Sequence, residues 1–295
     1  MSERPRSVVQ IVKPQPTSDG AGVKLSRCIG GHGLDYCDPF LLLDHFGSDD
    51  PADYLAGFPM HPHRGIETVT YMLDGEVDHR DTLGNEGRIG AGDVQWMTSG
   101  GGIMHEEMPR PPAEGSTRMG GFQLWVNMPA ELKMSEPRYR DVSAPDIPIV
   151  TRPDGTTIRI VAGTIDGVSG PVRELYADPF YADVTVPADT TAELPVAEDH
   201  AAFAYAFEGT GRFGVTDEEP GRNLRAPELA VFGPGDCVRV VTGDEPVRFL
   251  LAAARPLDEP VARYGPFVMN TREEIDQALH DLRDGTFVWT PGRDR

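Results

Sequence analysis

Short apolar segments separated by glycine, aspartate and proline follow one another along almost the whole chain. Several of them alternate apolar and polar residues with a period of two, as half-buried β-strands do. Examples are SVVQIVK, FLLLDHF, ETVTYML, DVQWMTS and FQLWVNM. The 33 glycines and 27 prolines supply the turns that many short strands require. The pattern therefore predicts an all-β protein.

A strand-and-turn pattern occurs twice in the chain. LDG at residues 73–75 is followed by GD at 92–93 and another strand-like segment, and FEG at 207–209 is followed by GD at 235–236 and another. Glycine adopts the positive φ of tight turns and aspartate bonds its own backbone there. Two such patterns indicate two tandem β-barrels.

The stretch around residues 126–155 is rich in proline and polar residues, and it is the best candidate for a linker. We therefore predict an N-terminal metal-binding barrel over residues 1–135 and a C-terminal barrel without metal over residues 136–295. The second barrel has only His200 near its first motif and contains no HxH sequence.

One helix is expected near the end of the chain, over residues 271–284. Thr271 and Glu274 have the spacing of a capping box, and Gly285 is suited to end the helix. An apolar stripe at helical spacing indicates that one face packs on a barrel. The stripe consists of Ile275, Ala278, Leu279 and Leu282.

Charge and cysteine content restrict the environment and the partners. The formal net charge of -20 disfavours direct binding to nucleic acid. The three cysteines, Cys28, Cys37 and Cys237, form no CxxC motif and fit a reducing compartment. The chain shows no signal-peptide pattern and no run of about 18 apolar residues. We therefore expect a cytoplasmic monomer that does not bind membranes.

The sequence His61-Pro62-His63 is the strongest local signal for chemistry. Residues i and i+2 of a strand point to the same face, so the two imidazoles would form a pair of nitrogen ligands. Pro62 cannot donate a hydrogen bond to a neighbouring strand, which places the segment at an edge or a barrel rim. On its own, an HxH sequence is equally compatible with surface or hydrogen-bonded histidines.

A second pair with the same spacing strengthens the metal interpretation. His105 and Glu107 also stand at i and i+2, and an antiparallel barrel can bring them to His61 and His63. Three imidazoles and one carboxylate suit a first-row transition ion, and they suit calcium or magnesium poorly. Four protein ligands on an octahedral ion would leave two positions open for substrate, water or dioxygen.

Three long motifs resemble those of the pirin family, within the cupin superfamily. They are FPMHPHRGIETVTYMLDGEVDHRDTLGNEGRIGAGDVQWMTSGGGIMHEEMP, GFQLWVNMP and GPFVMNTREEIDQAL, and they span most of the chain. The resemblance implies two stacked cupin barrels, with one metal ion in the N-terminal barrel. That ion is most often iron; copper, nickel, manganese and zinc are alternatives.

The resemblance also implies the roles of individual residues. The HPH motif corresponds to ligands His61 and His63, and the HxE motif to ligands His105 and Glu107. The general cupin pattern has a glutamate shortly after its HxH, where Glu67 stands, but pirins are taken to use the later glutamate. Three further residues in the pirin-like strands are candidates for lining the pocket, with ordinary core packing as the alternative. These are Trp96, Gln123 and Trp125.

Two functions of different classes follow from the resemblance. The first is a quercetin 2,3-dioxygenase-like enzyme, in which a flavonol 3-hydroxyl coordinates the metal and dioxygen cleaves the ring with release of carbon monoxide. Glu107 would then be the proton acceptor. The second is a redox-sensitive regulatory protein that acts through protein partners, as a transcriptional cofactor or a modulator of a metabolic enzyme.

Overall fold

The computed structural model describes residues 4–110 and 116–292. Contacts divide the chain into two compact units, and each unit contains segments that are distant in sequence. We call the first the N-terminal barrel; it comprises residues 15–30, 40–144 and the described residues from 257 onwards. The second, the C-terminal barrel, comprises the described residues up to 14, residues 31–39 and residues 145–256.

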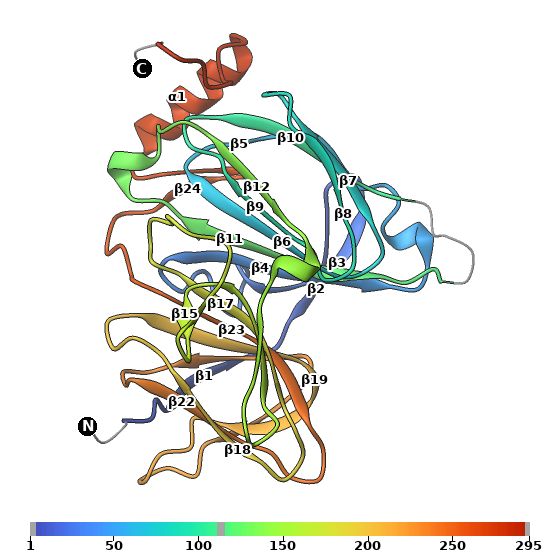
Figure 1. Ribbon diagram of the computed structural model, residues 1–295. Helices are drawn as coiled ribbons and strands as arrows, with labels where there is room; N and C mark the ends of the chain where they lie inside the picture. Colours follow the sequence, from blue (N-terminus) through green and yellow to red (C-terminus); the bar gives the residue numbers. More distant parts are fainter. Residues whose placement is uncertain (1–3, 111–115, 293–295) are drawn as a thin grey trace. The chain divides into compact units, whose positions relative to one another are not determined.

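The N-terminal barrel consists of a seven-stranded and a four-stranded antiparallel sheet (Figure 1). Its apolar core includes Val23, Leu25, Met72 and Met119. In order across the larger sheet, the strands are β12 (Arg138–Val142), β9 (Val94–Thr98), β6 (Ile66–Asp74), β11 (Met119–Asn127), β4 (Phe40–Ser48), β3 (Val23–Ile29) and β2 (Gln15–Asp19). The smaller sheet has β5 (Phe58–His63), β10 (Ile103–Pro109), β7 (Val77–Asp81) and β8 (Glu86–Ile89). Two short 3₁₀ helices, η1 (Pro51–Asp53) and η2 (Ala130–Leu132), belong to the same unit.

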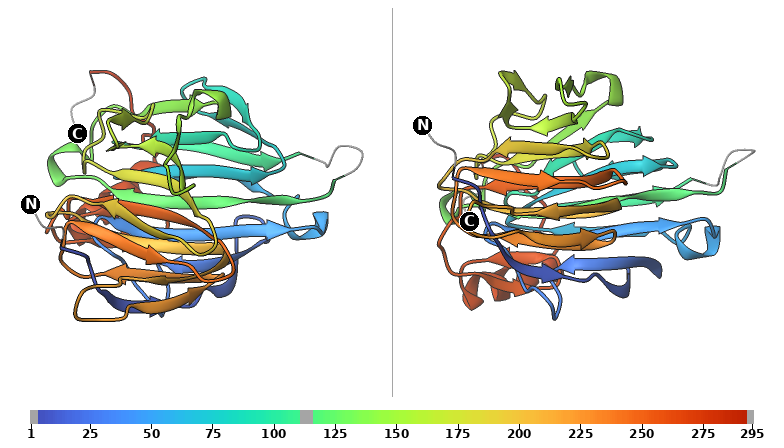
Figure 2. Two further views of the ribbon diagram at one scale, coloured as in Figure 1. Left: turned by 60° about the horizontal axis from the view of Figure 1, so that its bottom comes forward. Right: turned by 90° about the horizontal axis from the view of Figure 1, so that it is seen from below.

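The C-terminal barrel is built around one ten-stranded antiparallel sheet, most of whose strands are yellow or orange in Figure 2, whereas β1 is dark blue. Its hydrophobic core is rich in alanine. The main path is β1 (Val8–Val12), β21 (Glu228–Phe232), β19 (Ala201–Phe213), β23 (Val247–Ala254), β17 (Phe180–Val186), β14 (Thr157–Ala162) and β13 (Ile149–Thr151), while β18 (Thr191–Pro195), β20 (Arg222–Arg225) and β22 (Cys237–Val241) pair off this path. A small hairpin is formed by β15 (Thr164–Ile165) and β16 (Val168–Ser169). The prediction of an all-β chain with two barrels is confirmed.

The expected C-terminal helix is present as α1 (Arg272–Arg283). Thr271 and Glu274 form both hydrogen bonds of the capping box. The apolar stripe packs on Phe267, Met269 and Phe287 around the hairpin of β24 (Ala262–Tyr264) and β25 (Phe267–Met269). No helix within the described ranges is long and apolar enough to cross a membrane.

The segment proposed as a linker contributes to the folded structure. β12 lies inside residues 126–155 and pairs with β9. Its sequence, RYRDV, contains three charged residues and therefore does not resemble a strand in the sequence. The chain passes from one unit to the other between Ala144 and Pro145, near η3 (Ala144–Asp146). Helix α1 belongs to the N-terminal barrel, and β1 pairs with β21 of the C-terminal barrel. A single division of the chain after residue 135 does not describe these exchanges.

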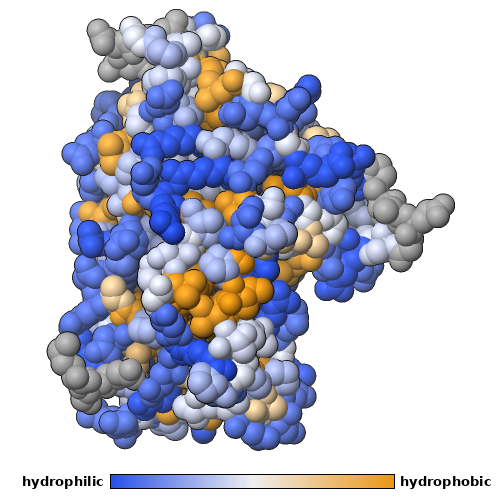
Figure 3. Space-filling model, viewed as in Figure 1, coloured by the Kyte–Doolittle hydropathy of each residue, from blue (hydrophilic) through white to orange (hydrophobic). Residues whose placement is uncertain are grey.

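The face drawn in Figure 3 is covered mainly by hydrophilic residues. This agrees with the 47 acidic residues in the sequence, which exceed the 27 lysines and arginines. Orange apolar patches remain among the hydrophilic residues of this face, while the barrel cores described above hold the buried apolar side chains.

His45 on β4 provides a stability test that is independent of any metal. Burial, with a smaller contribution from Arg118, lowers the pKa of His45 to about 4 from an ordinary value of 6.5. The folded state therefore disfavours the protonated ring, and stability that is complete above pH 6.5 is lost as the pH falls towards 4. We expect His45→Leu to reduce the loss of unfolding free energy between pH 7.5 and pH 5 by about 2 kcal/mol.

Urea unfolding of the parent and the variant at the two pH values measures this difference. Other titrating groups contribute equally to both proteins and cancel. Equal losses in the two proteins would contradict the assignment to His45.

Candidate metal centre

Strand β5 carries the HPH sequence at the edge of the four-stranded sheet. The expected edge position is therefore confirmed, since Pro62 could not donate a backbone hydrogen bond within a sheet. His63 is buried, and His61 is half-buried. Both line the same pocket, as two residues at i and i+2 should.

The neighbouring strand β10 carries the second pair of candidate ligands. His105 lies opposite His61 in the antiparallel register. The burial pattern of β10 alternates, and both His105 and Glu107 are on its buried face. A β-bulge shifts the register between them, so that Glu107 lies opposite Phe58. Bulges of this kind change the direction of nearby side chains and are common beside functional sites.

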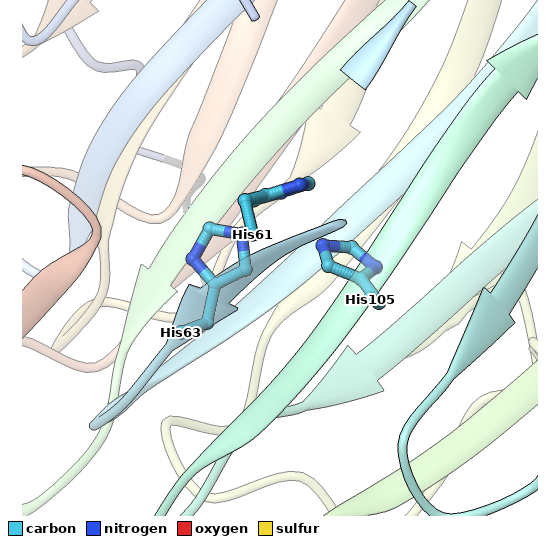
Figure 4. Close-up of side chains that lie close together, drawn as sticks. All are labelled: His61, His63 and His105. Atoms are coloured by element: carbon cyan, nitrogen blue, oxygen red, sulfur yellow. The ribbon is translucent and has the colours of Figure 1, made fainter. Parts of the chain in front are cut away.

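The three histidines gather beside one another, two from β5 and one from β10 (Figure 4). One ring nitrogen from each can be chosen so that the three atoms all lie within 4.8 Å of one another. The ring centroids of His61 and His105 are 4.4 Å apart, and those of His63 and His105 are 5.0 Å apart. Nitrogen atoms at this separation can bind one ion after small side-chain adjustments.

The hydrogen bonds of these rings leave nitrogen atoms available as ligands. His61 Nδ1 lies 3.0 Å from the carbonyl oxygen of Pro59, so Nδ1 must donate a proton and Nε2 keeps its lone pair. His63 Nδ1 and both ring nitrogens of His105 are buried and make no hydrogen bond to a described residue. Buried nitrogens without partners are unfavourable, and a metal ion would satisfy them.

The electrostatic surroundings keep two of the rings neutral. Burial, followed by the charge of His61, lowers the pKa of His63 well below 6.5. Burial, followed by His63 and His61, does the same for His105. Neutral imidazole is the form that binds metal, so no proton has to be displaced from these rings at pH 7.

Glu107 lies in the same pocket but does not join the group of three histidines. Its Oε1 accepts a hydrogen bond of 2.8 Å from Thr70 Oγ1 on β6. Thr70 Oγ1 is also 2.8 Å from the side-chain amide of Gln123. The neighbouring amide atom is Gln123 Oε1, and the single hydroxyl proton can be donated to only one of the two oxygens. If the amide is turned so that its NH2 group faces Thr70, the amide donates to Thr70 and Thr70 donates to Glu107. This chain of contacts holds one oxygen of Glu107 and leaves Oε2 without a hydrogen bond to a described residue.

Glu67, the alternative carboxylate, lies on the opposite face of β6 from the pocket. It is three residues from Thr70, which lines the pocket, and odd spacing along a strand reverses the face. Thr98 donates a hydrogen bond of 2.7 Å to Glu67, whose pKa is raised by burial. Glu67 therefore has a structural environment of its own and does not face the histidines.

His61 and His63 line a pocket of about 530 Å³ within the N-terminal barrel, and His105 is buried beside them. The volume of the pocket is in the range of sites for small molecules, and apolar and aromatic side chains predominate in its walls. Of the three candidates from the sequence, Gln123 and Trp125 line it, whereas Trp96 is buried outside it. The apolar wall comprises Val23, Leu25, Leu42, Phe46, Tyr54, Phe58, Val77, Met119 and Trp125.

Five polar residues of the pocket were not identified from the sequence: Asp19, Arg27, Asp44, Thr70 and Arg263. Strand alternation could have revealed two of them. Arg27 follows Val23 and Leu25 at intervals of two, and Asp44 stands between Leu42 and Phe46 at the same interval. A charge at an inward position of an otherwise apolar strand face is the signal that could have been used.

A second polar cluster lies beside Glu107 in the barrel. His79 on β7 is opposite Glu107 in register. Its Nε2 is 3.0 Å from Asp141, and its Nδ1 is 2.5 Å from the hydroxyl of Tyr139. Burial, followed by the charge of Glu107, raises the pKa of Tyr139, which therefore stays protonated. These bonds fix the ring of His79 next to the candidate carboxylate.

Comparison with known proteins agrees with this geometry. The family model for Pirin matches residues 22–126, and that for the Pirin C-terminal cupin domain matches residues 181–288. A pirin-like protein of Caulobacter vibrioides is 47% identical over 283 residues, covering 96% of this chain and 99% of the relative. A putative quercetin 2,3-dioxygenase of Pseudomonas aeruginosa is 43% identical and covers 97% and 99%.

A solved structure shows the same architecture. The crystal structure of a quercetin 2,3-dioxygenase from Acinetobacter baumannii has a TM-score of 0.86, at 32% sequence identity. The similarity covers 96% of this chain and 98% of that one. Together with the two matched domains, these similarities show that the chain belongs to the pirin family of the cupin superfamily.

Proposed function

We propose that this protein binds one transition-metal ion through His61, His63, His105 and Glu107, and that it cleaves the central ring of a flavonol with dioxygen. The observation that carries the proposal is the convergence of three imidazoles beside an apolar pocket large enough for a planar aromatic molecule. Relatives that are 37–43% identical and are described as putative quercetin 2,3-dioxygenases support the choice of substrate.

The donor set fits a first-row transition ion, and iron is the ion that we propose first. A bound ion would act as a Lewis acid and lower the pKa of a hydroxyl that coordinates to it. His61 would contribute Nε2, because its Nδ1 donates to Pro59. The buried nitrogens of His63 and His105 would complete the set of imidazole ligands.

The residues around the metal ligands would orient the substrate and accept its proton. Trp125 and Phe58 present aromatic surfaces that can hold a flat ring and exclude water. Glu107 would take the proton of the 3-hydroxyl on Oε2, while Thr70 holds Oε1. Replacing water by fixed protein groups in this way strengthens the electrostatic interactions in the site.

Turnover of a flavonol is the direct measurement. We expect protein loaded with iron, copper, nickel or manganese to consume quercetin and dioxygen and to release carbon monoxide in equal amounts. Loss of the flavonol absorption band, an oxygen electrode and headspace gas analysis would follow the three species. Metal-loaded protein that turns over no flavonol with any of the four ions would contradict the enzyme proposal and favour the regulatory alternative, in which protein partners respond to the metal's redox state.

The proposed location is the cytoplasm. None of Cys28, Cys37 and Cys237 forms a disulfide, and Cys28 and Cys237 are buried. Reduced cysteines in a chain of this size support a reducing compartment.

A further inference from the structure

The pocket contains an ion pair on the large sheet, on strands that carry none of the proposed metal ligands. Arg27 on β3 and Asp44 on β4 lie opposite each other in the antiparallel register, and both line the pocket. Both residues stand at inward positions among apolar neighbours, Leu25 on β3 and Leu42 on β4. Burying such a pair carries a desolvation penalty, and apolar residues would often stabilise the fold as well. A contribution to the stability of the fold is therefore a poor explanation for the Arg27–Asp44 ion pair.

The pair belongs to a row of polar side chains that crosses the sheet. Asp44 lies opposite Gln123 in β11, and Gln123 lies opposite Thr70 in β6. Thr70 bonds Glu107, so one end of the row reaches the candidate metal centre. Two strand spacings separate Asp44 from Thr70, which is about 10 Å. A flavonol has about this length from its metal-binding oxygens to its pendant ring.

The ion pair has hydrogen-bonding capacity left for a ligand. Arg27 donates from Nε to Asp44 Oδ1 at 2.9 Å and from Nη2 to Asp44 Oδ2 at 2.7 Å. Nη2 also bonds Asp19 at 2.8 Å, whereas Nη1 makes no bond to a residue in the described ranges. Each carboxylate oxygen of Asp44 keeps a further lone pair. A donor and an acceptor therefore stand side by side in the pocket.

Burial and the ion pair have opposing effects on these two groups. The hydrogen bonds that Arg27 donates to Asp44 raise the pKa of Arg27, and burial raises the pKa of Asp44 against the opposing effect of Arg27. The Asp44 side chain is 5% exposed and that of Arg27 is 20% exposed. Hydrogen bonds to charged groups at such shielded positions are the strong ones.

We propose that Arg27 and Asp44 form a distal subsite that binds the hydroxyl groups of the substrate's pendant ring. A phenolic hydroxyl both accepts and donates, and the pair offers Arg27 Nη1 as donor and Asp44 as acceptor. The apolar walls between the two polar ends would hold the rings themselves. The substrate class is thus a flavonol hydroxylated at both ends. This inference rests on the proposed function, because it takes the flavonol as the ligand.

Equilibrium binding tests the subsite without requiring turnover. The purified full-length protein is titrated anaerobically by calorimetry with quercetin, which has two hydroxyls on its pendant ring, and with galangin, which has none. We expect the parent to bind quercetin about 10- to 100-fold more tightly, as hydrogen bonds to charged groups would give. Asp44→Asn keeps a partner for Arg27 but loses the charge. It should bring the ratio of the quercetin and galangin affinities towards one, with little change in the affinity for galangin.

A second variant and a matched control guard against effects on folding. Arg27→Leu combined with Asp44→Leu removes the pair without leaving one charge buried, and it should also abolish the preference. The same double substitution at Arg248 and Asp183, a similar bidentate pair in the C-terminal barrel, should leave the preference unchanged.

The outcomes separate the two proposals. Equal affinity of the parent for both flavonols, or a preference that survives in both pocket variants, would overturn the subsite and leave the proposed function standing. Absence of binding by either flavonol to the parent would overturn the subsite together with the flavonol proposal. A preference lost in the pocket variants and kept in the control would support the subsite, whether or not turnover is observed.

Discussion

Replacing both His61 and His63 by alanine is expected to remove the metal ion and to leave the barrel folded. The two substitutions delete two of the three imidazoles whose nitrogens lie within 4.8 Å of one another. One histidine and one glutamate cannot hold a transition ion against buffer and water. The apolar core of the barrel, which includes Leu25, Met72 and Ile89, does not depend on these side chains.

Elemental analysis should find about one ion per chain in the parent and close to none in the double variant. Far-UV circular dichroism and the urea midpoint should show a folded protein in both cases. His200→Ala is the matched control in the C-terminal barrel, where His200 Nε2 lies 3.7 Å from Asp178 and 3.8 Å from Asp199. We expect that variant to retain its metal. A double variant with full occupancy, or a parent that takes up no metal after incubation with ferrous iron, would refute the proposed centre.

The sequence predicts the placement of the histidines, because strand geometry is local. A spacing of two residues places His61 with His63 and His105 with Glu107 on common faces, and Pro62 marks the edge of a sheet. The pairing of β5 with β10 then follows from barrel topology. The capping box of α1 is likewise a local signal, and it is present as expected.

Other features depend on contacts between distant segments, and a single sequence does not encode them in a readable pattern. The pairing of β1 with β21, in which Val8 lies opposite Phe232, is one example. The register that aligns Asp44, Gln123 and Thr70 is another, since it depends on how three strands pair. The distal pair and the polar row therefore emerge only from the folded structure.

The two glutamates of the barrel illustrate the same distinction. Both Glu67 and Glu107 are buried, and each accepts a hydrogen bond from a threonine. Thr98 lies on β9, which pairs with the strand of Glu67, whereas Thr70 lies in the other sheet from Glu107. Sequence motifs alone allow either to serve the metal. The direction of each side chain decides, because Glu107 lines the pocket and Glu67 lies on the other face of β6. Because of this difference, the same substitution at Glu67 can serve as the control for a substitution at Glu107.

Glu107→Gln is expected to separate metal binding from catalysis. The amide has nearly the same shape, and its oxygen can still accept from Thr70 and coordinate an ion, although more weakly without the negative charge. It cannot take up a proton near neutral pH. Metal occupancy should fall modestly, while flavonol cleavage should fall about 100-fold or more, which is the usual effect of losing a general base.

Glu67→Gln provides the control, because it makes the same chemical change to a buried carboxylate that does not face the pocket. We expect its turnover and metal content to match those of the parent, apart from any change in stability. Turnover per bound ion, measured for the three proteins, distinguishes the roles. If Glu107→Gln loses metal and turnover in proportion, Glu107 is a ligand only. Glu67 could not then serve as the base, because it lies on the far face of β6, and the base would have to be another group in the pocket.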